Sequence, residues 1–103
     1  MPYIEKKHVE KQINRTMFEE AVDNIPRLSN AGDLTFVMCE LIGKYIEDRG
    51  GLAFQNIAEV FGALQATDKE FTRRVYYPYE DIKRERNGDI RAFEKFFPAS
   101  IDR

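Results

Sequence analysis

A cluster of arginine, lysine and tyrosine residues near the end of the chain is its most unusual chemical feature. The cluster consists of Arg73, Arg74, Tyr76, Tyr77, Tyr79, Lys83, Arg84 and Arg86. Arginines beside aromatic rings can bind phosphate and stack on bases, and both residue types are favoured at protein–protein interfaces. We call these eight residues the basic–aromatic segment, and we expect them to be the binding residues of the protein.

Acidic residues interleaved with this segment leave its role open. They are Glu80, Asp81 and Glu85. Because they weaken the local positive potential, nucleic-acid binding is the alternative to a protein contact, not the first expectation. In a purely structural alternative, Arg73 or Arg74 pairs with Glu70 or Glu80, and the tyrosines pack against the first two helices.

Side chains suited to catalysis are few. The chain has one histidine, His8, and one cysteine, Cys39, and a nucleophilic dyad or a histidine metal site needs partners. We expect an exposed His8 and a Cys39 buried on the Val37–Leu41 face. Acids occur as the adjacent pairs Glu19–Glu20, Glu47–Asp48 and Glu80–Asp81. Small helical nucleotide pyrophosphohydrolases instead bind magnesium through acids three residues apart, so this enzyme class is the least favoured. No catalytic residue, metal or cofactor is expected.

Length and composition indicate one soluble domain over residues 1–103. Apolar residues make up 43% of the chain and charged residues 33%, with a net charge of −2. This balance gives no overall attraction to nucleic acid or anionic lipid. One cysteine allows no disulfide within the chain. No run is apolar enough to cross a membrane, and the first residues lack a secretory pattern, so we expect a cytoplasmic protein without membrane contact.

Apolar spacing and turn residues predict the helices. The first runs from about Lys6 to Asn24 and ends before Pro26. The second runs from about Asp33 to Arg49 and is stopped by glycines at positions 50 and 51. The third begins near Phe54 and reaches the Asn87–Gly88–Asp89 stop. Residues 90–97 are expected to form a short last helix that packs Phe93, Phe96 and Phe97 on the body of the protein.

The third helix carries an apolar stripe with two irregular positions. Its members are Phe54, Ile57, Phe61, Leu64, Phe71, Val75 and Ile82, three or four residues apart when Asp68 is counted as one step. Asp68 either pairs with Arg15 or Lys11 or marks the place where the stripe leaves the core. Pro78 either kinks the helix near Arg74 or starts a new one, and we expect two segments with an angle between them. The expected fold is therefore all-α: a small helical domain with three main helices, the third long and bent or broken at Pro78, and a short C-terminal helix.

The segment from Gly32 to Asp89 resembles a family of small uncharacterised proteins carried by tailed phages and prophages. Its most specific part is the string Arg-Arg-Val-x-x-Pro-Tyr-Glu-Asp-x-Lys-x-x-x-Asn-Gly-Asp, residues 73–89. The resemblance implies a phage or prophage source and no particular reaction. Taken with the residues, it leads us to expect a non-enzymatic helical module that binds a protein partner or itself as a homodimer. The alternative is a nucleic-acid-associated accessory protein that uses the same segment.

Overall fold

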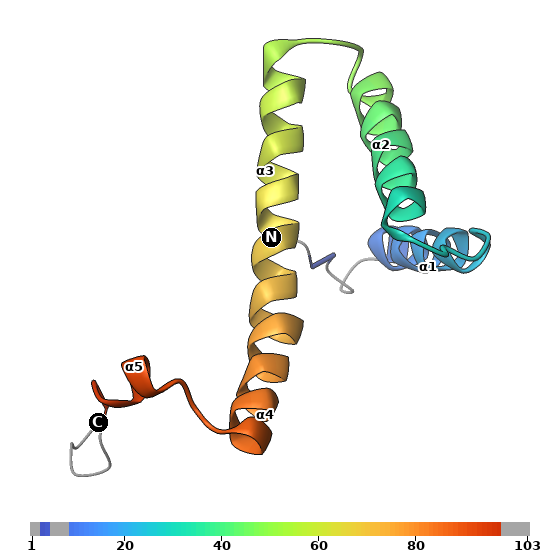
Figure 1. Ribbon diagram of the computed structural model, residues 1–103. Coiled ribbons are helices and arrows are strands. Elements are labelled where there is room, and N and C mark those ends of the chain that lie inside the picture. The colour runs from blue at the N-terminus through green and yellow to red at the C-terminus, as the bar shows by residue number, and fades with distance from the viewer. Residues whose placement is uncertain (1–2, 5–8, 98–103) are drawn as a thin grey trace. The chain divides into compact units, whose positions relative to one another are not determined.

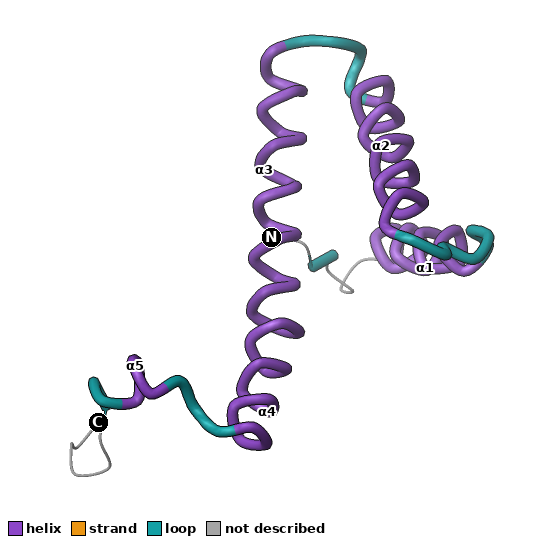
Figure 2. The backbone as a smooth tube through the Cα atoms, in the orientation of Figure 1, coloured by secondary structure: helices purple, strands orange, loops and turns teal. Residues whose placement is uncertain are grey.

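Helices form the regular structure of the protein in the computed structural model, which describes residues 3–4 and 9–97 (Figure 1). Within those ranges there is no strand (Figure 2), and the expected all-α class is confirmed. The chain divides into two units, residues 1–64 and residues 65–103. The helix that begins at Phe54 crosses this boundary without interruption.

The first unit contains α1 (Val9–Asp23), α2 (Ala31–Asp48) and the beginning of α3 (Phe54–Phe71). Helix α2 starts two residues before the predicted position because Asn30 caps it. The Asn30 side chain accepts a 2.8 Å hydrogen bond from the backbone N–H of Asp33. Asp33 in turn accepts a 2.9 Å bond from the backbone N–H of Ser29. The first bond satisfies a donor that the first turn of a helix would otherwise leave without a partner, and the second ties the residue before the cap to that turn.

Two glycines turn the chain between α2 and α3. Gly50 and Gly51 have φ angles of +97° and +111°, a region that other residues rarely adopt. The backbone N–H of Gly51 donates a 2.9 Å hydrogen bond to the carbonyl of Ile46. The end of α2 is therefore fixed locally by the residues that predicted it.

In the second unit, α3 continues through a π-helical segment, η1 (Thr72–Tyr76), into α4 (Tyr77–Asn87), and Figure 2 shows one unbroken helical path. The expectation of a long third helix, bent at Pro78, is confirmed. The two helical segments, α3 and α4, are joined because the chain forms a wider turn at η1 and the helix does not end there. The Tyr77 N–H bonds to the carbonyl of Thr72, five residues back. This wider turn makes room for the Pro78 ring, which would collide with the carbonyl of Arg74 in an α-helix.

The π-helical segment changes which residues line up along the helix. A π-bulge adds about one residue to an α-helical turn, so it shifts the residues after it by about one position around the axis. Uniform α-helical spacing placed Pro78 on the apolar stripe after Phe71 and Val75. With the wider turn, Tyr79 takes that place and Pro78 moves off the stripe.

The chain leaves α4 at Gly88, whose φ is +85° and whose N–H donates to the carbonyl of Arg84 at 3.0 Å. A four-residue helix, α5 (Arg91–Glu94), comes next. The expectation that Phe93, Phe96 and Phe97 pack on the body is wrong, because these side chains are 60–62% exposed. Phe93 belongs to the one turn of α5, and Phe96 and Phe97 follow that turn.

Among the described residues no hydrophobic side chain is buried, and the only buried residue is Asn56, at 6% exposure. Large apolar side chains are exposed on every helix, including Met17 on α1, Leu41 on α2 and Phe61 on α3. No helix in the part of the chain that the structure describes is long and apolar enough to cross a membrane.

Candidate functional site

The structure divides the basic–aromatic segment between two helix faces. Arg73, Arg74 and Tyr76 belong to η1, and the other five residues belong to α4. All eight are exposed. On α4, residues three or four apart share a face. Tyr79, Lys83 and Arg86 therefore lie on one face, and Tyr77 and Arg84 lie on another.

The Tyr79 face is aromatic and basic. The Lys83 ammonium lies 5.7 Å from the centre of the Tyr79 ring, within the range of a cation–π contact. The wider turn brings this face into line with Phe71 and Val75. One continuous line of side chains results: Asp68, Phe71, Val75, Tyr79, Lys83 and Arg86. We call these six residues the mixed stripe.

The opposite face carries ion pairs between residues three positions apart. Arg84 lies 3.8 Å from Asp81, and Arg73 donates to both carboxylate oxygens of Glu70 at 2.9 and 3.1 Å. The structural alternative is thus confirmed for the pairing of Arg73 with Glu70. The tyrosines of the segment are 50–59% exposed. Exposed pairs of this kind contribute at most about 1 kcal/mol each, and they reduce the positive potential on that face.

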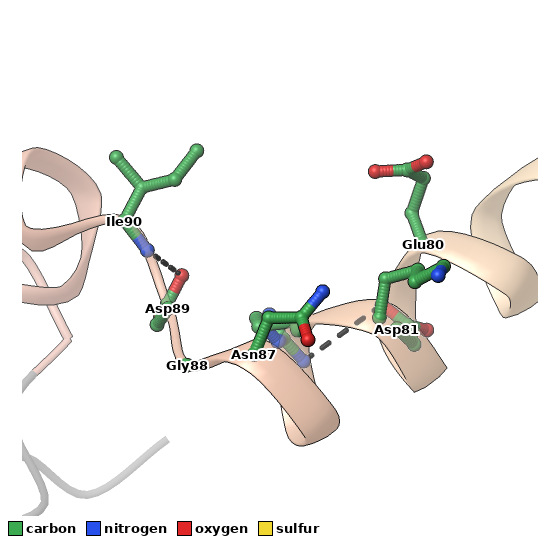
Figure 3. Close-up of a pocket in the computed structure, with 8 residues that line it drawn as sticks. Glu80, Asp81, Asn87, Gly88, Asp89 and Ile90 are labelled. Atoms are coloured by element: carbon green, nitrogen blue, oxygen red, sulfur yellow. Dashed lines mark hydrogen bonds and ion pairs between the residues drawn. The ribbon is translucent and has the colours of Figure 1, made fainter.

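A hollow of about 320 Å³ lies at the end of α4 (Figure 3). It is lined by Glu80, Asp81, Lys83, Arg84, Asn87, Gly88, Asp89 and Ile90. Charges of both signs line it, whereas ligand pockets are mostly apolar with a few polar groups. Asp89 uses one oxygen to accept a 2.7 Å bond from the Ile90 N–H. The residues that line the hollow therefore indicate no particular ligand.

The other candidate groups do not assemble into a reactive centre in the part of the chain that is described. Two acids in α1, Glu20 and Asp23, are three residues apart. The spacing of the acids therefore argues against a pyrophosphohydrolase less strongly than the adjacent pairs alone indicate. No group of three or more metal-ligating side chains forms within the described ranges. The expectation of a buried Cys39 is wrong, since Cys39 is exposed along with the apolar side chains around it. His8 lies outside the described residues.

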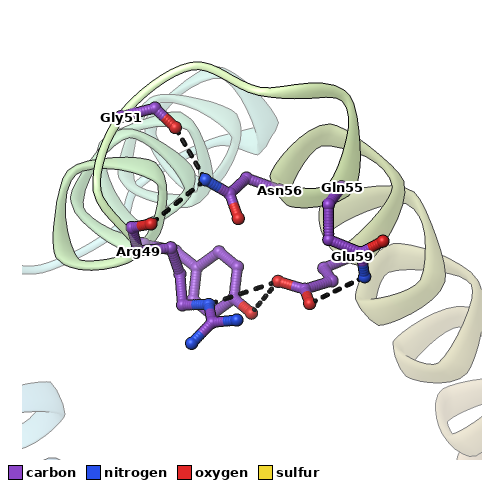
Figure 4. Close-up of polar contacts among 6 residues, drawn as sticks. Arg49, Gly51, Gln55, Asn56 and Glu59 are labelled. Carbon is purple, nitrogen blue, oxygen red and sulfur yellow. Dashed lines mark hydrogen bonds and ion pairs between the residues drawn. The ribbon is translucent and has the colours of Figure 1, made fainter.

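A polar cluster at the α2–α3 corner is the best-defined tertiary contact (Figure 4). The Asn56 amide donates to the backbone carbonyls of Gly51 at 2.7 Å and Arg49 at 3.3 Å. The Tyr45 hydroxyl donates to Glu59 at 2.7 Å, and Arg49 lies 3.4 Å from the same carboxylate oxygen. Sequence reasoning missed this cluster, because residues 45 and 59 meet only when the chain turns back at the two glycines.

Hydrogen bonding shifts the pKa values of Tyr45 and Glu59 in this cluster. Bonds from the Tyr45 hydroxyl and then from the Gln55 amide lower the pKa of Glu59, because both stabilise the ionised carboxylate. The bond to Glu59 raises the pKa of Tyr45. Both shifts favour one state, a neutral phenol that donates to a charged carboxylate.

The sequence matches a known family over most of the chain. The model of a family described as Domain of unknown function (DUF6899) matches residues 1–90. The chain belongs to this family. The match includes α1, which lies outside the phage-protein resemblance, and it ends before α5 begins at Arg91. No curated protein and no solved structure matches the chain significantly.

Substituting Glu59 is expected to remove part of the acid sensitivity of the protein. Because the pKa of Glu59 is lowered by folding, its contribution to stability is fully present above the unfolded-state pKa. That contribution is lost as the pH falls through the lower folded-state pKa. Glu59→Gln should therefore differ most from the wild type near neutral pH and least at pH values well below about 4.

Urea unfolding followed by circular dichroism at several pH values measures this difference. Glu47→Gln, which changes an exposed glutamate of α2, is the matched control and should show no such convergence. A constant difference between wild type and Glu59→Gln across the pH range would contradict the expectation.

Proposed function

We propose that this protein is a helical protein-interaction module whose long third helix binds another protein chain. The observation that carries the proposal is the exposure of its apolar side chains. No hydrophobic residue is buried in the described part of the chain, yet each long helix carries large apolar side chains. Burial of apolar surface is the main favourable term in protein association, so these faces favour contact with a partner.

The mixed stripe has the composition of a protein interface. It combines the aromatic rings of Phe71 and Tyr79 with the Arg86 guanidinium, residue types that are enriched where proteins meet. Phe71, Val75 and Tyr79 are 51–61% exposed, so each has apolar area to lose on binding. Nucleic acid stays the alternative partner, but Lys83 and Arg86 are the only cations on the stripe, and Asp68 opposes them. A protein contact uses the rings as well as the charges and therefore fits the stripe better.

Replacing Phe71 with glutamate is expected to abolish association and to preserve the helix. A charge at the centre of an apolar contact would have to be desolvated without a partner. The full chain should be captured in a complex heavier than its own 12.1 kDa, and the variant should sediment as the 12.1 kDa monomer with unchanged helical circular dichroism. Lys69→Glu, next to the stripe on the same helix, is the control that should keep the complex.

We propose to look for that complex in cells that are infected by phage or carry a prophage, because residues 73–89 resemble a family of phage and prophage proteins. The chain is tagged, and the mass and composition of its complexes are compared for the wild type and both variants. The proposal would be overturned if the wild type is a monomer and its backbone amides in residues 71–87 are as protected from hydrogen exchange as those of a closed core. The chain would then cover its own apolar side chains.

A further inference from the structure

We propose that the partner of the mixed stripe is a second copy of the same chain, bound antiparallel through residues 68–86. This inference rests on the proposed function, because it names the partner of the same surface. It is carried by the order of charges along the stripe. All six stripe residues belong to the second unit, so the inference needs no particular placement of the first.

The stripe is self-complementary about its middle. In an antiparallel pair with two-fold symmetry, residues equally far before and after the axis face each other. With the axis beside Tyr77, Asp68 lies nine residues before it and Arg86 nine after. Asp68 of one copy thus faces Arg86 of the other, and symmetry forms this ion pair twice.

The inner positions of the stripe match in the same register. Phe71 lies six residues before Tyr77, and Lys83 lies six after it. The aliphatic stem of Lys83 can cover a ring while its ammonium stays in water. Val75 lies two residues before the axis and Tyr79 two after it, which places an aliphatic side chain against an aromatic one. Charges therefore flank an apolar centre, as in many protein interfaces.

A parallel pair has the opposite electrostatics. It would place Asp68 against Asp68, Lys83 against Lys83 and Arg86 against Arg86 of the second copy. Like charges face to face oppose association and select against that arrangement. The order of charges thus favours the antiparallel pair over the parallel one.

The inference explains why a carboxylate occupies the apolar stripe. Asp68 is exposed, and one of its carboxylate oxygens accepts a long, 3.4 Å hydrogen bond from the Thr72 hydroxyl. That bond leaves the second carboxylate oxygen available to a guanidinium. In the antiparallel pair Asp68 supplies half of an ion pair that fixes the register.

Charge reversal on the full-length protein tests the pairing. Asp68→Arg and Arg86→Asp should each raise the dimer dissociation constant at least about tenfold, because each places like charges in contact twice. The double variant Asp68→Arg/Arg86→Asp restores opposite charges and should return the constant to within about threefold of the wild-type value. Sedimentation velocity over a concentration series measures all four proteins.

Two control variants carry charge changes of the same size at positions outside both the mixed stripe and the basic–aromatic segment. Glu85→Arg matches Asp68→Arg, and Lys69→Asp matches Arg86→Asp. Both should keep the wild-type dissociation constant. Circular dichroism verifies that each variant stays helical.

The outcomes separate this inference from the proposed function. A wild-type monomer at high micromolar concentration overturns the inference, and so does a double variant as weak as either single variant. If that monomer still joins a complex with a different protein, and Phe71→Glu abolishes the complex, the proposed function stands without the dimer. If binding is instead to a random oligonucleotide and falls steeply with salt, nucleic acid replaces protein as the partner and both proposals fail.

Discussion

Replacing Pro78 with alanine is expected to stabilise the third helix and to weaken self-association. Alanine restores a backbone N–H and removes the ring that an α-helical turn cannot accommodate. Proline costs about 3 kcal/mol in a regular α-helix interior, and the wide turn already avoids part of that cost. The chain then has no need for the wide turn marked by the Tyr77–Thr72 hydrogen bond. We expect η1 to relax to an α-helix.

Weaker association results from the change of register. Without the additional residue of the π-bulge, residues after position 77 rotate back by about one position. Tyr79 and Arg86 then leave the line that contains Phe71 and Val75, and Asp68 no longer faces Arg86 of a second copy. The dimer dissociation constant should rise at least about tenfold, although the monomer has become more stable.

Pro78→Gly is the control that separates the two effects. Glycine also restores the N–H but favours the helix by about 1 kcal/mol less than alanine. Both variants should lose the dimer. At protein concentrations below the dimer dissociation constant, the Pro78→Ala monomer should have the higher melting temperature. Unchanged dimer affinity in Pro78→Ala would show that the wide turn does not set the register of the stripe.

Replacing Asn56 with aspartate is expected to have the largest effect on the α2–α3 corner. The change keeps the size of the side chain but removes the N–H₂ group that donates to the carbonyls of Gly51 and Arg49. A carboxylate oxygen would then face two carbonyl oxygens at a site that is 6% exposed. Loss of the hydrogen bonds at a buried site costs about 1–3 kcal/mol.

Thermal unfolding measures this loss, which corresponds to about 4–8 °C for each kcal/mol in a chain of this size. Gln65→Glu makes the same amide-to-carboxylate change at an exposed position of α3 and should leave the melting temperature nearly unchanged. At acidic pH, Asn56→Asp should regain part of its stability, because a protonated carboxyl can donate one hydrogen bond. Equal melting temperatures for the two variants would contradict the role of Asn56.

The corner and the stripe have different roles. The corner is built from polar contacts within one chain, which fix the end of α2 against the start of α3. The stripe has only local contacts along its own helix, such as Thr72 with Asp68 and Lys83 with Tyr79, and it carries exposed apolar area. Loss of stability without loss of association is therefore expected for Asn56→Asp, and the reverse for Phe71→Glu.

The amino-acid sequence by itself determined the helical class and, to within a few residues, where the long helices lie. Asn30 acts through its side chain, and Gly50–Gly51 and Gly88 act through backbone bonds, on residues a few positions away, and such signals are readable in sequence. The same holds for the apolar faces. The sequence left four pairings open, of Arg73 or Arg74 with Glu70 or Glu80, and the structure shows the one between Arg73 and Glu70, which lie three residues apart on the helix.

Only the tertiary structure decided which polar groups meet and which residues share a face beyond Pro78. Asn56 is buried because the glycine turn brings two carbonyls to it, and no spacing rule predicts that contact. Tyr79 joins the line of Phe71 and Val75 because a proline ring is accommodated by a wider turn, whereas a uniform period of about 3.6 residues puts Pro78 there. Cys39 and the rings of Phe93, Phe96 and Phe97 are exposed because burial depends on a neighbour to cover them, and the neighbours of a side chain are a property of the folded chain.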